Sequence, residues 1–249
     1  MGNTIKTIKL MLIALLACLS MGANASLITI GTFTGGDSGD GLDFVGNFTY
    51  AVNVFGAGGF SIDDASFTDD SVSGVSISAV NAISNWHTAN YGNTQNDNNL
   101  ETVMRSIRWS PRANNGSQVR DDVVTIDLGN LTVGSTYSLQ LLFAETCCTR
   151  GFDLSFEGVK TVDDFSPYIT QGQDLNTSET NITTVGAFIR YDFTAQDSTL
   201  NISFGGAAPF SDNNPIINGF TLESTKVSAP STLAIFALCL FMLARMRRA

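Results

Sequence analysis

Three aspartates in a glycine-rich segment are the first residues of this chain that suggest chemistry. Asp37, Asp40 and Asp43 lie between residues 35 and 43, a segment that also contains four glycines. Carboxylate oxygens on a flexible loop suit a hard cation such as Ca²⁺. The segment lacks the ligand spacing and the terminal glutamate of an EF-hand, so the alternative to a calcium site is a solvated acidic loop.

A catalytic set is harder to find. His87 is the only histidine, which excludes a histidine-rich metal site and leaves any Ser-His-Asp arrangement dependent on one loop residue. Paired carboxylates hydrolyse glycosides in many enzymes, but no pair stands out here. Glu145 directly follows a predicted strand, where an acidic residue more often anchors a turn. We therefore expect a protein that is not an enzyme and has no cofactor beyond a structural Ca²⁺.

Aromatic and sulfur-containing residues suggest binding and redox chemistry. Trp86 and Tyr91 lie in an Asn-rich stretch, residues 84 to 101, where they either stack on glycans or pack the loop. Cys147 and Cys148 are adjacent. In an oxidising compartment they form a vicinal disulfide, link to another chain or remain free thiols, and we favour the vicinal disulfide.

The elements that must position these residues are strands. Apolar residues alternate in many short segments, and no helical period persists between residues 26 and 224. The predicted strands cover residues 48–54, 72–80, 103–109, 123–128, 137–143, 152–156, 187–193, 200–204 and 216–222. Turn residues separate them. This pattern predicts an all-β, antiparallel two-sheet sandwich of the jelly-roll type, with no helix inside the domain and residues 84 to 101 as its longest irregular loop.

Charge narrows the class of partner. All 23 acidic residues lie between residues 26 and 224, whereas six of the 13 basic residues lie outside this range, so the domain keeps seven basic residues and a net charge of −16. Such a surface repels phosphate backbones and anionic headgroups. Nucleic acid is excluded, and cations or neutral glycans are favoured.

Several runs, in order, resemble the malectin-like branch of the galactose-binding-like sandwiches. They are residues 50 to 59, residues 102 to 110, the pair Phe143-Ala144-Glu145 and Arg150-Gly151-Phe152-Asp153-Leu154, and residues 212 to 218. The resemblance covers residues 50 to 222 and implies the same sandwich fold. It also implies a sugar site at the loop end, where aromatic rings and an aspartate hold the ligand. Either Asp212 or Asn213 takes the aspartate position, and the aromatics would be Trp86, Tyr91 and Phe210.

The N-terminus predicts export. Lys6 and Lys9 precede an apolar stretch, and Ala23-Asn24-Ala25 before Ser26 is the small-x-small pattern that signal peptidase cuts after. Residues 1–25 are thus a predicted signal peptide, and cleavage between Ala25 and Ser26 leaves a domain of residues 26–224. A lipoprotein box ending at Cys18 is the alternative.

The C-terminus predicts sorting. A linker at 225–230 contains Val227-Ser228-Ala229-Pro230; an apolar helix at 231–244 and a basic end at 245–249, with Arg245, Arg247 and Arg248, follow it. The apolar run is shorter than the roughly 20 residues that cross a bilayer unaided. The layout resembles the PEP-CTERM signal that bacterial exosortases recognise, although Ser228 and Ala229 replace its Pro and Glu. An ordinary membrane anchor is the alternative, and the terminal arginines argue against a eukaryotic lipid-anchor signal.

Together these features predict an exported, surface-sorted protein. It would meet signal peptidase and an exosortase-type enzyme, and its C-terminal helix would hold it in the inner membrane at least transiently. At the bacterial cell surface or in the extracellular matrix, its sandwich would bind a polysaccharide. The alternative is a structural matrix protein of the same fold without a small-ligand site.

Overall fold

The computed structural model describes residues 26–86, 88–111, 123–172, 184–205 and 209–225. The predicted signal peptide, its cleavage site at Ala25, and the sorting residues from Val227 to Arg248 lie outside these residues. Within the described ranges, no helix is long and apolar enough to cross a membrane.

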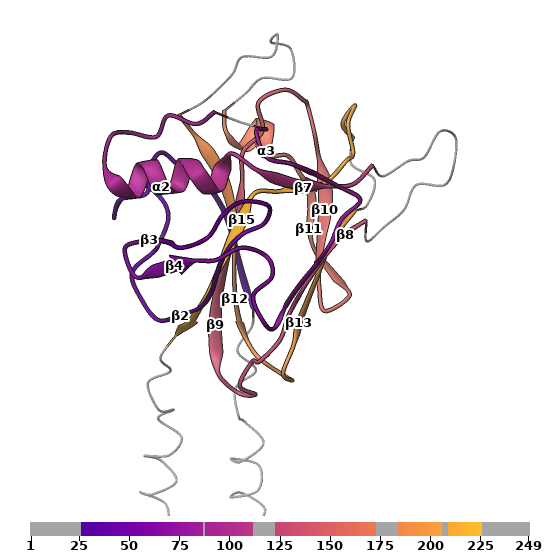
Figure 1. Ribbon diagram of the computed structural model, residues 1–249. Coiled ribbons are helices and arrows are strands. Elements are labelled where there is room, and N and C mark those ends of the chain that lie inside the picture. Colours follow the sequence, from indigo (N-terminus) through magenta and orange to yellow (C-terminus); the bar gives the residue numbers. More distant parts are fainter. Residues whose placement is uncertain (1–25, 87, 112–122, 173–183, 206–208, 226–249) are drawn as a thin grey trace, which may run out of the picture. The chain divides into compact units, whose positions relative to one another are not determined.

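Two five-stranded sheets form the fold, and every strand pair in them is antiparallel (Figure 1). The first sheet has the order β1 (Leu27–Phe33), β12 (Gly186–Thr194), β9 (Thr136–Phe143), β15 (Gly219–Thr225) and β2 (Phe48–Asn53). The second has the order β11 (Val159–Phe165), β10 (Phe152–Phe156), β13 (Leu200–Gly205), β8 (Val124–Leu128) and β5 (Val75–Ser78). The predicted all-β, antiparallel two-sheet sandwich is confirmed.

The main core lies between the two sheets because their strands alternate. Successive side chains of a strand point to opposite faces, so Leu139 and Leu141 of β9 meet Leu154 of β10 in one apolar cluster. Phe143, Phe152, Phe165 and Phe204 pack ring against ring at one end of it. Burying each such side chain contributes roughly 1.5–3 kcal/mol, so this layer dominates the stability of the sandwich.

A second apolar cluster covers part of the other face of the first sheet. Leu142 of β9 packs there with Leu100 and Met104 of α2 (Gln95–Met104) and with Phe67 of a small hairpin. That hairpin pairs β3 (Phe60–Ile62) with β4 (Ala65–Phe67) and lies beside α2 (Figure 1). Alternation predicts strands buried on one face, but β9 is buried on both. On its outer side, α2 and the hairpin cover Leu142, and the backbone of Asp43 covers Gln140.

The helix α2 corrects the prediction of an irregular loop from residue 84 to 101 and of a strand beginning at residue 103. Thr94 and Asp97 form a reciprocal capping box at its start. Leu100, Val103 and Met104 then form one short apolar stripe. The Asn-rich first half hides the helical period, since only the last residues of the helix face the core.

Strands β1 and β11 were not predicted, because each lies at the edge of its sheet. In β1 and β11 exposed positions outnumber buried ones, which weakens their alternation. The strand β14 (Ile216–Ile217) pairs with β7 (Ile107–Trp109), which pairs with β6 (Asn81–Ile83). A one-turn helix, α3 (Pro167–Thr170), follows β11.

Candidate functional site

The connection between β9 and β10, residues 144 to 151, is organised by the buried carboxylate of Glu145. Its Oε1 accepts hydrogen bonds from the backbone amides of Thr146, Cys147 and Cys148 at 3.0, 3.0 and 3.2 Å. Gln171, just after α3, clamps the Glu145 backbone: its Oε1 accepts from the amide and its Nε2 donates to the carbonyl. Glu145 therefore anchors the turn, as expected of an acidic residue directly after a strand.

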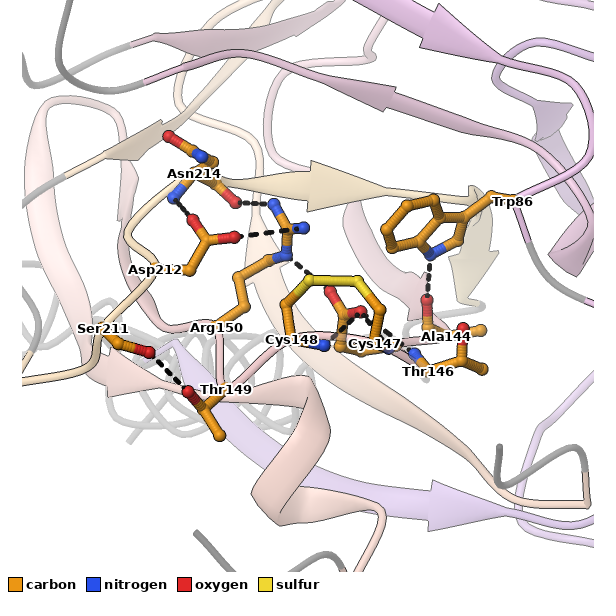
Figure 2. The surroundings of a disulfide bond; sticks show 11 residues. Trp86, Ala144, Thr146, Cys147, Cys148, Thr149, Arg150, Ser211, Asp212 and Asn214 are labelled. Carbon is orange, nitrogen blue, oxygen red and sulfur yellow. Dashed lines mark hydrogen bonds and ion pairs between the residues drawn. A yellow bond between two sulfur atoms is a disulfide. The ribbon is translucent and has the colours of Figure 1, made fainter. Parts of the chain in front are cut away.

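Cys147 and Cys148 lie on this turn and form a vicinal disulfide, the first of the three alternatives considered (Figure 2). Both residues are half-buried. A bridge between neighbours in sequence joins no separate strands. The disulfide therefore shapes the turn and does not cross-link the sheets.

Arg150 is the centre of the site and is itself almost fully buried. Its Nε lies 2.5 Å from Oε2 of Glu145, its Nη1 donates to the carbonyl of Asn214 at 2.6 Å, and its Nη2 lies 3.3 Å from Oδ2 of Asp212. Burial raises the pKa of Glu145, and the charge of Arg150 together with the turn amides offsets part of that rise. The guanidinium thus ties the β9–β10 turn to the segment before β14.

Trp86 lies on the other side of this guanidinium (Figure 2). The centre of its ring is 5.6 Å from Cζ of Arg150, within cation–π range. Its indole Nε1 donates to the carbonyl of Ala144 at 3.1 Å, at the end of β9. The ring is half-buried, so one part of it packs on the core and another part faces solvent.

Asp212, Asn213 and Phe210 reach the same place from the segment between β13 and β14. Asp212 is partly exposed, and its Oδ1 accepts from the amide of Asn214 at 2.8 Å. Asn213 donates from Nδ2 to the carbonyl of Phe210. The Phe210 ring lies against Gly151, where any larger residue would collide with it. Of the two candidates for the acidic position, Asp212 is the one that contacts Arg150.

Tyr91 lies apart from these residues. It is 8% exposed and packs against Phe33 in the cluster beneath α2, with 5.4 Å between the ring centres. Burial raises the pKa of its phenol strongly, with a smaller effect of Glu101. A ring this enclosed has no open face for a ligand, so Tyr91 is not part of the site around Arg150.

Two of the three predicted cation ligands lie together, and the third lies elsewhere. Asp37 and Asp40 are close together, and their third partner is Asp97 of α2, with carboxylate oxygens all within 4.8 Å. Asp43 lies elsewhere, where its amide donates to Gln140. Three carboxylates at this spacing fit the oxygen-only ligand set of Ca²⁺. The helix supplies the third carboxylate of this cluster, which local sequence could not indicate.

Arg150 is a site residue that was not predicted, and the buried ion pair of Glu145 with it was not predicted either. Both lie in the run Phe143-Ala144-Glu145 … Arg150-Gly151-Phe152, so the signal was present as a motif. What the motif could not indicate is that the arginine is buried and joins Trp86 to Asp212. These two residues lie far apart in sequence, and the pairing depends on how β9 and β14 meet.

No known protein family matches this sequence, and no curated protein matches it. Solved structures do. The plant receptor-like kinase ANX1 has a TM-score of 0.52 and 14% identity over 72% of this chain and 49% of its own. The ANXUR2 extracellular domain from Arabidopsis thaliana has a TM-score of 0.49 and 12% identity, over 71% and 41%. The β-glucuronidase 2 of Bacteroides uniformis has a TM-score of 0.46 and 17% identity, over 71% and 18%.

These likenesses concern the fold. The similarity to ANX1 supports the β-sandwich fold that the sequence predicts. The chain spans about half of that receptor structure and about a fifth of the glucuronidase chain.

Proposed function

We propose that this protein is exported and that its sandwich binds carbohydrate, without catalysis, at the cell surface or in an extracellular polysaccharide matrix. The observation that carries the proposal is the meeting of Trp86 and Asp212 around Arg150 at one end of the sandwich. An aromatic face packs on the C–H groups of a sugar, and a carboxylate accepts hydrogen bonds from its hydroxyls. Both groups reach the surface here beside the vicinal disulfide.

Electrostatics supports a neutral ligand. The domain carries a net charge of −16, so anionic polymers are repelled at long range. Locally, the positive charge of Arg150 is balanced by Glu145 and Asp212. A neutral saccharide is not repelled by the negative charge of the domain or by the charges around Arg150.

The non-catalytic character rests on the state of Glu145. A general acid must reach the substrate, whereas this carboxylate is fully buried and already accepts three amides and one guanidinium. Asp212, the other acid of the site, is bound to the same arginine. Hydrolysis of neutral and anionic glycosides by the purified protein is the direct assay, and a turnover that Glu145→Gln abolishes would contradict the proposal.

Sorting by the two ends of the chain is part of the proposal. The predicted cleavage after Ala25 and the PEP-CTERM-like tail from Val227 to Arg248 would deliver the domain to the surface. Mass spectrometry of the protein isolated from its host determines both mature termini and the state of Cys147 and Cys148. Retention of residues 1–25, or a C-terminus still ending at Ala249, would contradict processing at that end.

We also propose that Asp37, Asp40 and Asp97 hold a structural Ca²⁺ between the β1–β2 loop and α2. Adding Ca²⁺ is expected to raise the melting temperature relative to the protein in a chelator, because a ligand that binds only the folded state stabilises it. Asp40→Asn should remove this rise. Asp43→Asn is the matched control, since Asp43 lies in the same loop but outside the cluster. Equal responses of the two variants would contradict the site.

A structural matrix protein without a ligand site is the second candidate. It is favoured by the satisfaction of the polar atoms at the site: the Trp86 indole N–H, the Arg150 guanidinium and the Asp212 carboxylate all have partners within the chain. On this alternative the same residues only join the turn to the sheet.

A glycan array and calorimetry with matched variants separate the two candidates. Trp86→Ala and Asp212→Asn are expected to reduce affinity for a bound glycan at least tenfold. The controls are Phe55→Ala and Asp70→Asn, since Phe55 and Asp70 make the same two kinds of contact with Arg108. Binding that survives the first two substitutions, or no binding to any glycan, favours the structural candidate.

A further inference from the structure

A groove of about 360 Å³ opens on the face of the first sheet that is turned away from the main core. It shares no residue with the site around Arg150. Strand β1, strand β12, Gln140 of β9 and the loop at residues 41 to 43 form its walls. Its volume lies at the lower end of the roughly 300–1,000 Å³ that small-molecule sites occupy.

The strand register places complementary groups side by side in this groove. Arg190 of β12 pairs with Thr29 of β1 on one side and with Gln140 of β9 on the other, so the three side chains form one row. Asp192 lies two residues along β12 and therefore on the same face. Gln140 is held by Thr221 and by both backbone polar groups of Asp43, so it forms a fixed wall.

The arginine of the groove is only partly used. Arg190 donates from Nε to Asp192 at 3.0 Å, and both side chains are about one-third exposed. In the described part of the chain, its two Nη groups have no partner. In this respect Arg190 differs from Arg150, whose three nitrogens all have acceptors. Arg190 can therefore donate to a ligand while Asp192 accepts from it.

An apolar surface adjoins these charges. The ring of Phe188 lies across Gly31 of β1: a Cβ at that glycine would lie 2.7 Å from the ring, so only glycine allows this approach. Leu27 of β1 is 59% exposed at the rim. The groove thus offers an aromatic ring, guanidinium donors and carboxylate acceptors together.

The local charge argues for a neutral ligand. Asp43, Asp192 and Glu223 lie near Arg190, and among the described residues of this groove Arg190 is the only cation, which leaves the region negative. Burial raises the pKa of Glu223, and the nearby Asp43 raises it further. An anionic group would meet this field unfavourably, whereas a hydroxyl can accept from Arg190 and donate to Asp192 at once.

We propose that this groove is a second saccharide site, which takes one neutral sugar unit with its apolar face on Phe188 and its hydroxyls between Arg190 and Asp192. It extends the proposed function, because a domain that binds one polymer at two separate places can cross-link chains of a matrix.

The test is NMR titration of the purified protein with neutral gluco-, galacto- and manno-oligosaccharides, with oligogalacturonide as the anionic comparison. A neutral oligosaccharide is expected to shift the amides of Thr29, Gly41 and Asp192. Arg190→Ala and Asp192→Asn should each lower the affinity derived from these shifts at least tenfold. Arg108→Ala is the matched control, being another partly exposed arginine paired with an aspartate, and it should change nothing.

The outcomes separate this site from the one at Arg150. Shifts confined to the surroundings of Trp86 would overturn the groove and leave the proposed function standing. Shifts in the groove that persist in Trp86→Ala would support it, whatever happens at the other site. Binding of oligogalacturonide in preference to neutral sugars, or groove shifts that Arg190→Ala leaves unchanged, would overturn it. The melting temperatures of the variants should change little, because an exposed ion pair contributes about 1 kcal/mol or less. Such melting temperatures exclude loss of folding as the cause of weaker binding.

Discussion

Arg150 and Arg108 are two versions of the same arrangement in different surroundings. Each guanidinium lies under an aromatic ring, Trp86 at 5.6 Å in one case and Phe55 at 5.0 Å in the other. Each also pairs with an aspartate and donates to a backbone carbonyl. The difference is burial: the Arg150 side chain is 5% exposed and the Arg108 side chain 24% exposed.

Burial changes what the two arginines contribute. Near the surface, water and salt screen an ion pair, and its net contribution is about 0–1 kcal/mol. In the interior, a charge left without its partner cannot be solvated. This explains why Arg150 has a second carboxylate, Glu145, which is itself saturated by backbone amides. The same kinds of contact thus anchor the fold at Arg150 and contribute little to its stability at Arg108.

The largest expected effect is that of Arg150→Ala, which should lower the free energy of unfolding by about 3–5 kcal/mol, because the buried carboxylate of Glu145 loses its cation. Urea denaturation measures the change. Adding Glu145→Gln to this variant should restore part of the loss, since the uncompensated charge is removed. A loss below about 1 kcal/mol would contradict the assigned role of Arg150.

Asp97 sharpens the comparison, because it is a buried carboxylate that forms no ion pair with any described residue. Burial by itself raises the pKa of Asp97, but hydrogen bonds from Gly36 and Thr94 outweigh this effect, and the pKa lies below its ordinary value of 3.8. In Ca²⁺-free buffer at pH 7, Asp97→Asn should cost about 1–2 kcal/mol, since it weakens charged hydrogen bonds and the capping box.

The stabilisation by the Asp97 carboxylate depends on pH. Because the folded-state pKa is the lower one, the stabilisation by Asp97 is complete above about pH 4 and is lost as the pH falls through the folded-state value. The difference between Asp97→Asn and the native protein should therefore shrink below pH 4. A difference that grows on acidification would contradict the lowered pKa.

The vicinal disulfide tests whether the turn depends on sulfur or on Glu145 and Arg150. A disulfide stabilises mainly by closing a loop in the unfolded chain, and this loop is the shortest possible. Replacing both Cys147 and Cys148 by serine should cost about 1 kcal/mol, far less than Arg150→Ala. Urea curves of this variant and of the native protein provide the measurement, and a larger loss than that of Arg150→Ala would reverse the ranking.

The smallest expected effect is that of Arg108→Ala. Its ion pair with Asp70 and its contact with Phe55 are both partly exposed, so the loss should be below about 1 kcal/mol and should decrease as salt is added. Thermal unfolding at low and high ionic strength measures it. A loss equal to that of Arg150→Ala would remove burial as the explanation of the difference between the two arginines.

How much the sequence predicts differs between the fold and the site. Alternation of Leu139, Leu141 and Phe143 is a local signal, and it sufficed for the strands and the all-β class. The helix α2 was missed because its apolar stripe is short. At the site, Trp86 and Asp212 were predicted one by one, from loop context and from the family resemblance. The same reasoning also selected Tyr91, which is buried in the structure.

By itself, then, the sequence determined the layered β architecture, the negative charge of residues 26–224 and the restriction of any disulfide within that range to Cys147 and Cys148. Each of these depends on periodicity, composition or adjacency. Only the tertiary structure decided which carboxylates meet at Asp97 and that Glu145 is buried. It also decided that Arg150 joins Trp86 to Asp212, while the two Nη groups of Arg190 have no partner among the described residues. Those relations arise where strands distant in sequence pack together, and burial, which sets the strength of each charge, exists only after that packing.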